Sequence, residues 1–264
     1  MKKKSLLCIT FVFMIILGQI QTLAAGTSAI DWYCLRAKEH KQPLADANLR
    51  VIENFDGYYI DHSHGDQCND KVVYLTFDAG YENGNVEKIL DVLKEENVHG
   101  AFFILSHLIE KHPSLVIRMG NEGHTVANHT STHKDITLLS EDELKQELTE
   151  IESLYSKATN REMAKFFRPP EGRFNASALG YLQKLGYKTV FWSLAYADWD
   201  NDAQPSPEIA LKKLCDNVHN GAVILLHPTS STNAKILPNF IQKLKEEGYR
   251  FGSLNELTQQ KSNS

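Results

Sequence analysis

The sequence predicts an α/β fold in which a parallel sheet, open or closed into a barrel, carries helices on its outside. From Lys71 onward, short apolar runs alternate with amphipathic stretches, an order that is typical of parallel strands joined by helical crossovers. The composition is that of a globular chain, with 42% hydrophobic and 23% charged residues in a length of 264. These proportions exclude disordered, collagen-like and disulfide-dense chains.

The expected elements follow one another along this region. The helix at residues 86–95 carries its apolar residues on one face. Ser140 begins a long helix, because Glu143 follows three residues later and completes a capping box. Strands are expected at residues 72–77, 101–105, 125–127, 166–167, 189–192 and 222–226, and further helices at 114–121, 176–185, 207–218 and 235–247.

The N-terminus has the layout of a secretory signal. Three lysines at positions 2–4 precede an apolar stretch at residues 6–20, and Ala24 and Ala25 supply small residues for cleavage. The alternative is an uncleaved anchor, but the stretch is short for a span of ~20 apolar residues. We therefore expect residues 1–25 to be a signal peptide, and the mature protein to be exported without stable membrane insertion.

Residues 26–70 are aromatic-rich and irregular, and they are expected to pack as an N-terminal extension on a main domain at 71–264. The net charge of -5 and the absence of a long basic run exclude nucleic acid as a partner. After cleavage three cysteines remain, Cys34, Cys68 and Cys215. A pair between Cys34 and Cys68 is one option in an oxidising compartment, and free thiols are the favoured one.

Polar side chains gather where the predicted strands end. In parallel α/β folds these carboxyl ends meet at one edge, where active sites are built. The residues at these positions are Asp78, His129, His133, Arg168, Asp198 and His227. This pattern predicts one site formed by loops that are far apart in the sequence.

Two histidines of this group suggest a metal. His129 and His133 stand four residues apart, so one helical turn would put both imidazoles on one face, as a divalent cation requires. A short pair of this kind can also be a coincidence, but its position at a strand end favours the metal.

The other four residues suggest acid–base chemistry. Asp78 is either a loop or capping residue or a general base, and Arg168 nearby would keep it ionised. His227 is either a core histidine or a general acid held by Asp198. Trp192 and Trp199 are candidates for the apolar walls of a sugar site or for the core.

Five motifs in a fixed order make the chain resemble the polysaccharide deacetylases, which have the NodB-type domain of carbohydrate esterase family 4. They are Thr76-Phe77-Asp78-Ala79-Gly80, His129-Thr130-Ser131-Thr132-His133, Arg168-Pro169-Pro170-Glu171-Gly172, Asp198-Trp199 and Leu225-Leu226-His227. The resemblance covers about residues 71–257. Gly80-Tyr81-Glu82-Asn83-Gly84 and the extension around Trp32 resemble the branch of muramic acid deacetylases that act in making the muramic δ-lactam of spore cortex.

The resemblance implies a distorted (β/α) barrel that hydrolyses an N-acetyl group to an amine and acetate. It makes Asp78 the base, His227 the acid, Arg168 and Asp198 their partners, and His129 and His133 ligands of a divalent metal such as Zn. Substrate contacts are expected from Tyr81, Glu82, Asn83, Trp199 and Leu225, with Leu225 lining the acetyl pocket. The implied partner is peptidoglycan whose glycan strands lack stem peptides, in the cell wall or between the spore membranes.

Two positions depart from the family's pattern. Ala79 stands where the family usually has a metal-binding Asp, so we expect weak metal binding, completed by water, substrate or Glu82. The alternatives are catalysis by Asp78 and His227 without a tightly held metal, or a non-catalytic peptidoglycan-binding protein. Ala195 replaces the first Asp of the fourth motif. An N-acetylglucosamine or chitin-type deacetylase is the competing enzyme of the same class.

Overall fold

The structure, a computed structural model, describes residues 26–259. The expected signal peptide at residues 1–25 lies outside this range. Within the described part, none of the helices combines the length and the apolar character that crossing a membrane requires.

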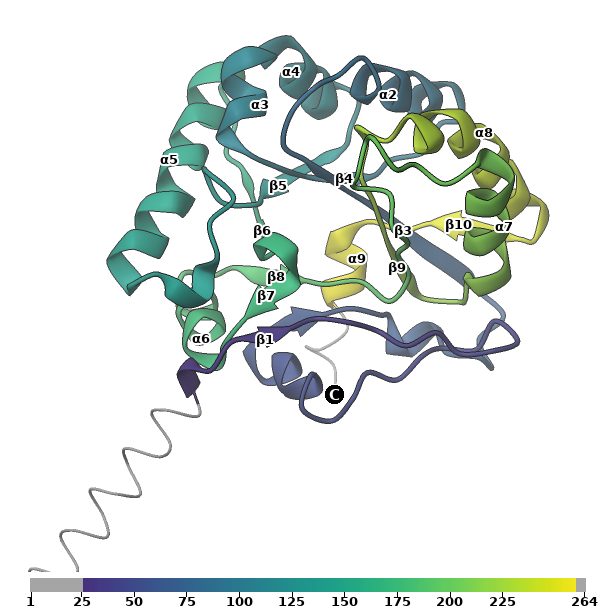
Figure 1. Ribbon diagram of the computed structural model, residues 1–264, viewed down its shortest axis with the longest axis horizontal. Coiled ribbons are helices and arrows are strands. Elements are labelled where there is room, and N and C mark those ends of the chain that lie inside the picture. Colours follow the sequence, from purple (N-terminus) through teal and green to yellow (C-terminus); the bar gives the residue numbers. More distant parts are fainter. Residues whose placement is uncertain (1–25, 260–264) are drawn as a thin grey trace, which may run out of the picture.

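A curled parallel sheet forms the centre of the molecule (Figure 1). Its strand order is β10-β3-β4-β5-β6-β8-β2, and β9 pairs with the other edge of β3. The strands are β2 (Gly57–Tyr58), β3 (Lys71–Ala79), β4 (Ala101–Ile104), β5 (Thr125–Asn128), β6 (Ala164–Phe167), β8 (Lys188–Val190), β9 (Ala222–Leu226) and β10 (Tyr249–Phe251). A bridge between Leu194 and Ile224 brings the two sides of the sheet together beyond the end of β8. The predicted α/β fold with a distorted barrel is confirmed.

Most helices lie outside the sheet, as the alternation predicts, but Leu254 and Leu257 of the last helix pack with side chains of the barrel interior (Figure 1). They are α2 (Val86–Glu95), α3 (Ser106–Lys111), α4 (Pro113–Asn121), α5 (Glu141–Thr159), α6 (Ala176–Lys184), α7 (Pro207–Asn217), α8 (Ser231–Glu246) and α9 (Leu254–Gln259). Short 3-10 helices occur in the connections, η1 (Arg50–Phe55), η2 (His62–His64), η3 (Ile136–Leu138) and η4 (Pro170–Gly172).

Local capping explains where the predicted helices begin. Ser140 and Glu143 form the predicted capping box of α5. Helix α8 begins at Ser231, earlier than predicted, because the Ser230 side chain accepts from Asn233 N and caps it. Helix α3 was not predicted, since its six residues are too few to show a helical period.

Side chains of β3 alternate between two environments, as in any strand. Leu75, Phe77 and Ala79 belong to the cluster that packs beneath α2 and α8. Thr76 and Asp78 face the inside of the barrel, where Thr76 Oγ1 donates to Ile224 O at 2.6 Å. The alternation therefore directs the Asp78 carboxylate into the barrel near the end of the strand.

The N-terminal segment lies along one side of the barrel (Figure 1). Its strand β2 pairs with β8, and Ile60 bridges to Ala222, so these residues fill the gap between β8 and β9. Strand β1 (Ile30–Asp31) pairs with β7 (Arg173–Phe174) in a separate antiparallel ribbon. Residues 26–70 thus contribute a strand to the main sheet as well as a packed extension.

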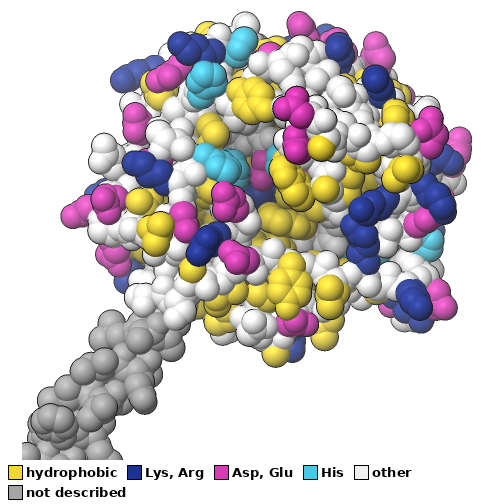
Figure 2. All heavy atoms as spheres, viewed as in Figure 1, with side chains coloured by type: hydrophobic (Ala, Val, Ile, Leu, Met, Phe, Trp, Pro, Cys, Tyr) yellow, Lys and Arg dark blue, Asp and Glu magenta, His cyan; other side chains and the backbone are white. Residues whose placement is uncertain are grey.

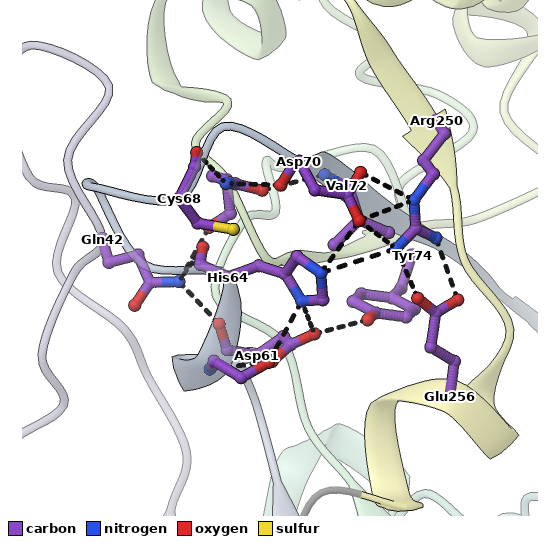
Figure 3. Close-up of polar contacts among 11 residues, drawn as sticks. Gln42, Asp61, His64, Cys68, Asp70, Val72, Tyr74, Arg250 and Glu256 are labelled. Atoms are coloured by element: carbon purple, nitrogen blue, oxygen red, sulfur yellow. Dashed lines mark hydrogen bonds and ion pairs between the residues drawn. The ribbon is translucent and has the colours of Figure 1, made fainter.

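A buried polar network ties this segment to the barrel (Figure 3). Asp61 is 2% exposed and accepts from Tyr74 Oη at 2.6 Å. His64 lies between two carboxylates, with Nδ1 2.7 Å from Asp61 Oδ2 and Nε2 3.2 Å from Asp70 Oδ2. Arg250 on β10 donates to Asp70 at 2.8 Å and so extends the network to the C-terminal part of the chain. The network therefore joins the end of the N-terminal segment and β3 to β10, which is distant in sequence.

Candidate active site

A cavity of about 660 Å³ opens at the carboxyl ends of the strands. It is lined by Asp78, His129, His133, Glu171, Gly172, Trp192, Ala195, Tyr196, Ala197, Trp199, Leu225 and His227. The face drawn in Figure 2 is hollowed near its centre, and hydrophobic and histidine side chains border the hollow. The strand ends bring together the predicted residues, with Arg168 and Asp198 buried behind this lining.

Arg168 holds Asp78 in place. The guanidinium is fully buried, and Nη1 donates to Asp78 Oδ1 at 2.8 Å. Its other donors are occupied as well, since Nη2 donates to Thr76 Oγ1 at 2.9 Å and Nε to Val190 O at 2.9 Å. Burial alone would raise the pKa of Asp78, but the charge and hydrogen bond of Arg168 and the charge of His227 outweigh it and hold that pKa below its usual value. The Asp78 carboxylate is therefore ionised at neutral pH.

A non-helical loop brings His129 and His133 together, so the prediction that one helical turn does so is wrong. Residues 129–133 lie outside any helix, and both Thr130 and His133 have positive φ, 69° and 61°. Asn128 Oδ1 accepts from Thr130 N at 2.9 Å, and Thr130 Oγ1 accepts from His133 N at 2.9 Å. These side-chain caps fold the loop so that the two imidazole centroids lie 4.9 Å apart.

His129 presents a free ring nitrogen to the cavity. Its Nδ1 lies 2.8 Å from Arg168 O, and because a carbonyl only accepts, Nδ1 carries the proton. Nε2 then keeps its lone pair and lies 3.7 Å from Asp78 Oδ2. Burial lowers the pKa of His129 to about 4, so the ring is neutral. A neutral imidazole with its second nitrogen bonded to a carbonyl is the form in which histidine binds metals.

The donor set fits part of a divalent-cation site. His129 and His133 offer two imidazoles, while the Ala79 methyl is fully buried in the apolar cluster and supplies no ligand. Glu82 is not directed there, because its carboxylate accepts from Gly84 N and Val86 N and caps α2. Within residues 26–259, no group of three or more His, Cys, Asp or Glu side chains is placed to hold a metal ion.

His227 is held by a buried carboxylate. Its Nδ1 lies 2.7 Å from Asp198 Oδ1, and its backbone N donates to Asp198 Oδ2 at 2.8 Å. Asn233 on α8 also donates to Asp198 Oδ2, at 2.6 Å. Burial alone would lower the pKa of His227, but the hydrogen bond and charge of Asp198 outweigh it and raise that pKa. The histidine is thus suited to carry a proton at neutral pH.

Apolar and aromatic side chains form the remaining walls. Trp199 is 63% exposed and lies beside His227, with ring centroids 6.3 Å apart. Leu225 is 5% exposed and lies on β9, two residues before His227, which directly follows the strand, and both line the cavity. Trp192 lines the cavity as well.

Three residues expected to contact substrate lie elsewhere. Tyr81 is 43% exposed, and its hydroxyl accepts from Asn201 Nδ2 at 2.6 Å. Asn83 Nδ2 donates to Thr229 O at 2.9 Å. Neither these two nor Glu82 is among the described residues that line the cavity. The segment after β3 instead forms the connection into α2.

Sequence reasoning also missed contributors to the site. Glu171 and Tyr196 line the cavity, and Asn233 supports Asp198 from behind. Glu171 stands inside the third motif and takes a positive φ of 59°. Asn233 could not be found, because it lies on helix α8 outside the motifs and acts through its contact with Asp198.

Comparisons with known proteins agree with this geometry. The sequence profile of the polysaccharide deacetylase family matches residues 65–190. The chain is 37% identical to the peptidoglycan-N-acetylmuramic acid deacetylase PdaA of Bacillus subtilis over 241 residues, covering 91% of this chain and 90% of PdaA. The solved structure of PdaA, described as a family 4 carbohydrate esterase, has a TM-score of 0.83 and covers 89% of this chain and 99% of that one.

The names of two further relatives state a different substrate and a lack of activity. A peptidoglycan-N-acetylglucosamine deacetylase of Bacillus cereus is 30% identical over 204 residues, covering 73% of this chain and 91% of that protein. The solved structure of a family 4 carbohydrate esterase pseudoenzyme from Bacillus anthracis is 29% identical with a TM-score of 0.68, covering 76% of this chain and 68% of that one. Relatives of this chain thus include proteins named as enzymes and one described as a pseudoenzyme.

Proposed function

Because the chain belongs to the polysaccharide deacetylase family, we propose that it is an exported hydrolase that removes the N-acetyl group of N-acetylmuramic acid in peptidoglycan. Its substrate is glycan strand that lacks stem peptides, and the reaction is a step towards muramic δ-lactam in spore cortex. One observation carries the proposal: the Asp78–Arg168 and His227–Asp198 pairs face the same cavity, beside two histidines. The similarity to PdaA over 90% of its length supports the choice of muramic acid.

Asp78 is the general base of this reaction. Its carboxylate is ionised at neutral pH, because Arg168 donates to Oδ1 at 2.8 Å. Oδ2 remains free to accept a proton from the attacking water as its oxygen bonds to the amide carbon. Buried Arg168 thus fixes both the charge and the direction of the base.

His227 is the general acid. Asp198 raises the pKa of the imidazole and orients the ring through the 2.7 Å contact to Nδ1, so Nε2 can carry a proton to the sugar nitrogen. That nitrogen leaves as an amine when the carbon–nitrogen bond breaks, and the acetyl group leaves as acetate. Leu225 and Trp199 provide apolar contact for the acetyl methyl group and the sugar.

His129 and His133 would hold a divalent cation such as Zn²⁺, which when bound polarises the amide carbonyl and lowers the pKa of water. We expect weak binding, because Ala79 offers no donor and two neutral imidazoles supply all the protein ligands. Water or substrate would fill the other positions. His129 is pre-oriented for this role by its Nδ1 contact to Arg168 O.

Two alternatives have specific support. The absence of a carboxylate at Ala79, with a pseudoenzyme among the relatives, favours a non-catalytic peptidoglycan-binding protein. Against it, all four members of the two acid–base pairs are present and bonded to one another. The similarity to the Bacillus cereus protein favours an N-acetylglucosamine deacetylase in peptidoglycan or chitin-like glycans.

An assay of acetate release distinguishes the proposed function from these two alternatives. The mature protein is incubated with peptide-free cortex-like strands, peptide-bearing peptidoglycan and chitin oligomers, each with and without a chelator. We expect release from the peptide-free strands, and its loss in Asp78→Asn and His227→Ala with glycan binding retained. Release from chitin oligomers alone would favour the glucosamine enzyme. No release from any substrate, even with added Zn²⁺ or Co²⁺, would favour the binding protein.

A further inference from the structure

A second cavity, of about 380 Å³, adjoins the candidate active site. One side is formed by Trp32, Tyr33, Cys34, Leu35 and Arg36 of the N-terminal extension, and the other by Trp192, Ser193 and Ala195. Trp192 and Ala195 line both cavities, so the two share a wall. We call the second one the extension cavity. The extension cavity can therefore hold a substituent of a sugar whose acetamide group occupies the active-site cavity.

The extension cavity is built on a firmly seated segment. Trp32 is 5% exposed, its Nε1 donates to Trp192 O at 2.9 Å, and its backbone N donates to Gly172 O at 3.1 Å. Its ring packs on Phe191 with centroids 4.7 Å apart. Beyond this anchor, Tyr33 and Leu35 are 45% and 66% exposed. The segment therefore exposes side chains to solvent, while the contacts of Trp32 hold its backbone in place.

Arg36 gives the extension cavity its charge. Among the residues lining the two cavities, it alone is a lysine or arginine. Its Nη2 donates to Ala195 O at 3.0 Å, which holds the guanidinium against the shared wall. Within residues 26–259, no carboxylate lies in ion-pair contact with it. An exposed guanidinium fixed by one neutral contact keeps donors for an anionic ligand.

We propose that the extension cavity is a substrate subsite in which Arg36 binds the free carboxylate of the lactyl ether of muramic acid. This rests on the proposed function. The lactyl ether starts at O3, one ring carbon away from the acetamide at C2, so a group that recognises it must lie beside the acetamide cavity. Arg36 lies beside this cavity, because its guanidinium contacts Ala195 in the shared wall.

The same contact explains why stem peptides matter. A stem peptide converts the lactyl carboxylate into a neutral amide, which removes the charge that Arg36 pairs with and adds a chain that must pass the exposed Tyr33 and Leu35. N-Acetylglucosamine has no lactyl group and gains nothing from Arg36. Arg36 thus favours peptide-free muramic acid over both competing substrates.

The experiment compares variants on chemically matched substrates. The substrates are peptide-free muramic strands, the same strands with the lactyl carboxylate coupled to methylamine, and N-acetylglucosamine oligomers. The variants are Arg36→Gln, Ala195→Asp, which places a competing carboxylate beside Arg36, and Lys38→Gln as control. Lys38 is an exposed cation of the same segment that lines neither cavity.

We expect Arg36→Gln and Ala195→Asp to raise KM for the carboxylate strands about 10- to 100-fold, because a charge-assisted hydrogen bond is lost. Wild type and Arg36→Gln should turn over the amidated strands equally, and Lys38→Gln should match wild type throughout. An equal loss on both kinds of strand, or no loss on either, overturns the subsite.

Calorimetry keeps this test separate from the proposed function. Binding of carboxylate and amidated strands is measured on the same variants in the absence of turnover. Weaker binding of the carboxylate strands alone in Arg36→Gln supports the subsite even if no acetate is released from any substrate, an outcome that would overturn the deacetylase. Equal binding of both strands by wild type and Arg36→Gln overturns the subsite whatever the activity.

Discussion

Asp198→Asn tests how the proposed acid is held. In the wild type, Asp198 accepts from His227 Nδ1 at 2.7 Å, from His227 N at 2.8 Å and from Asn233 Nδ2 at 2.6 Å. Three donors thus converge on one carboxylate that is 1% exposed. An Asn side chain of the same shape has one accepting oxygen and one NH₂ group, so at least one donor is left facing another donor.

The size of the effect follows from the lost charge. A hydrogen bond to a charged group contributes ~1.5–3 kcal/mol, and one pKa unit corresponds to about 1.4 kcal/mol. Without the carboxylate, the burial that lowers the pKa of His227 is opposed only by the charge of Asp78. We therefore expect the pKa of His227 to fall. Loss of ring orientation adds to this, and a positioned acid is worth about 10²–10⁴ in rate.

The assay is acetate release from peptide-free strands as a function of pH. His227 acts in its protonated form, so activity falls as pH rises through its pKa, and this basic limb of kcat/KM should move to lower pH in Asp198→Asn. Asp200→Asn is the matched control, because Asp200 is exposed and accepts from Asp202 N at 3.0 Å. A basic limb at the same pH in Asp198→Asn and wild type would refute the assignment of Asp198 and His227.

Three further predictions concern the metal, the polar network and the extension. The family usually has a metal-binding Asp at position 79, so Ala79→Asp should tighten Zn²⁺ binding in calorimetry. It should also lower stability by about 3 kcal/mol in chelator, since the Ala79 side chain packs in an apolar cluster. Unchanged affinity would show that a carboxylate at this position does not reach the site of His129 and His133. Asp61→Asn should lower the free energy of unfolding by about 2–4 kcal/mol at neutral pH. Burial alone would raise the pKa of Asp61, but hydrogen bonds from Tyr74, Ser63 and His64 outweigh it and lower that pKa. The stabilisation is therefore present above the unfolded-state pKa and lost as pH falls through the folded one, so denaturation curves of variant and wild type should converge in acid; a constant difference contradicts this. Gly172→Ala should lower the melting temperature more than Gly186→Ala, because both residues have positive φ, 68° and 80°, but only the Cβ at 172 would meet Trp192 Cη2 at 2.7 Å. Equal losses would show that the packing of Trp192 on the extension does not depend on Gly172.

Much of the fold was predictable from the sequence, because most helices and strands show a pattern of apolar residues within their own length. Helix α2 has the predicted bounds, since its apolar face repeats with the helical period over ten residues. Strand β2 was not predicted, because two residues carry no period and its pairing with β8 is set by tertiary contacts. The extension therefore enters the sheet in a way that its own sequence does not reveal.

The site residues that could be predicted from the sequence are those at the carboxyl ends of the strands. Parallel strands place Asp78, Arg168 and His227 at one edge whatever the loops do. The meeting of His129 and His133 was predicted for the wrong reason, since spacing alone cannot distinguish a helical turn from a loop with two positive φ values. Asn233 and Arg36 act through contacts between distant segments, which periodicity and spacing do not encode.

The two departures from the family's pattern concern different parts of the site. Ala79 and Ala195 each stand where the family usually has Asp, but of the two Ala195 lines the wall shared by the two cavities. A carboxylate about 4 Å from an anionic substrate group costs ~4 kcal/mol at an effective dielectric constant of 20, so the absence of one at Ala195 favours a sugar that carries a negative charge. Ala79 lines neither cavity, and there we expect weaker metal binding, which would leave more of the chemistry to Asp78 and His227. Arg168 and Asp198 hold these two residues from buried positions, and that support depends on neither alanine.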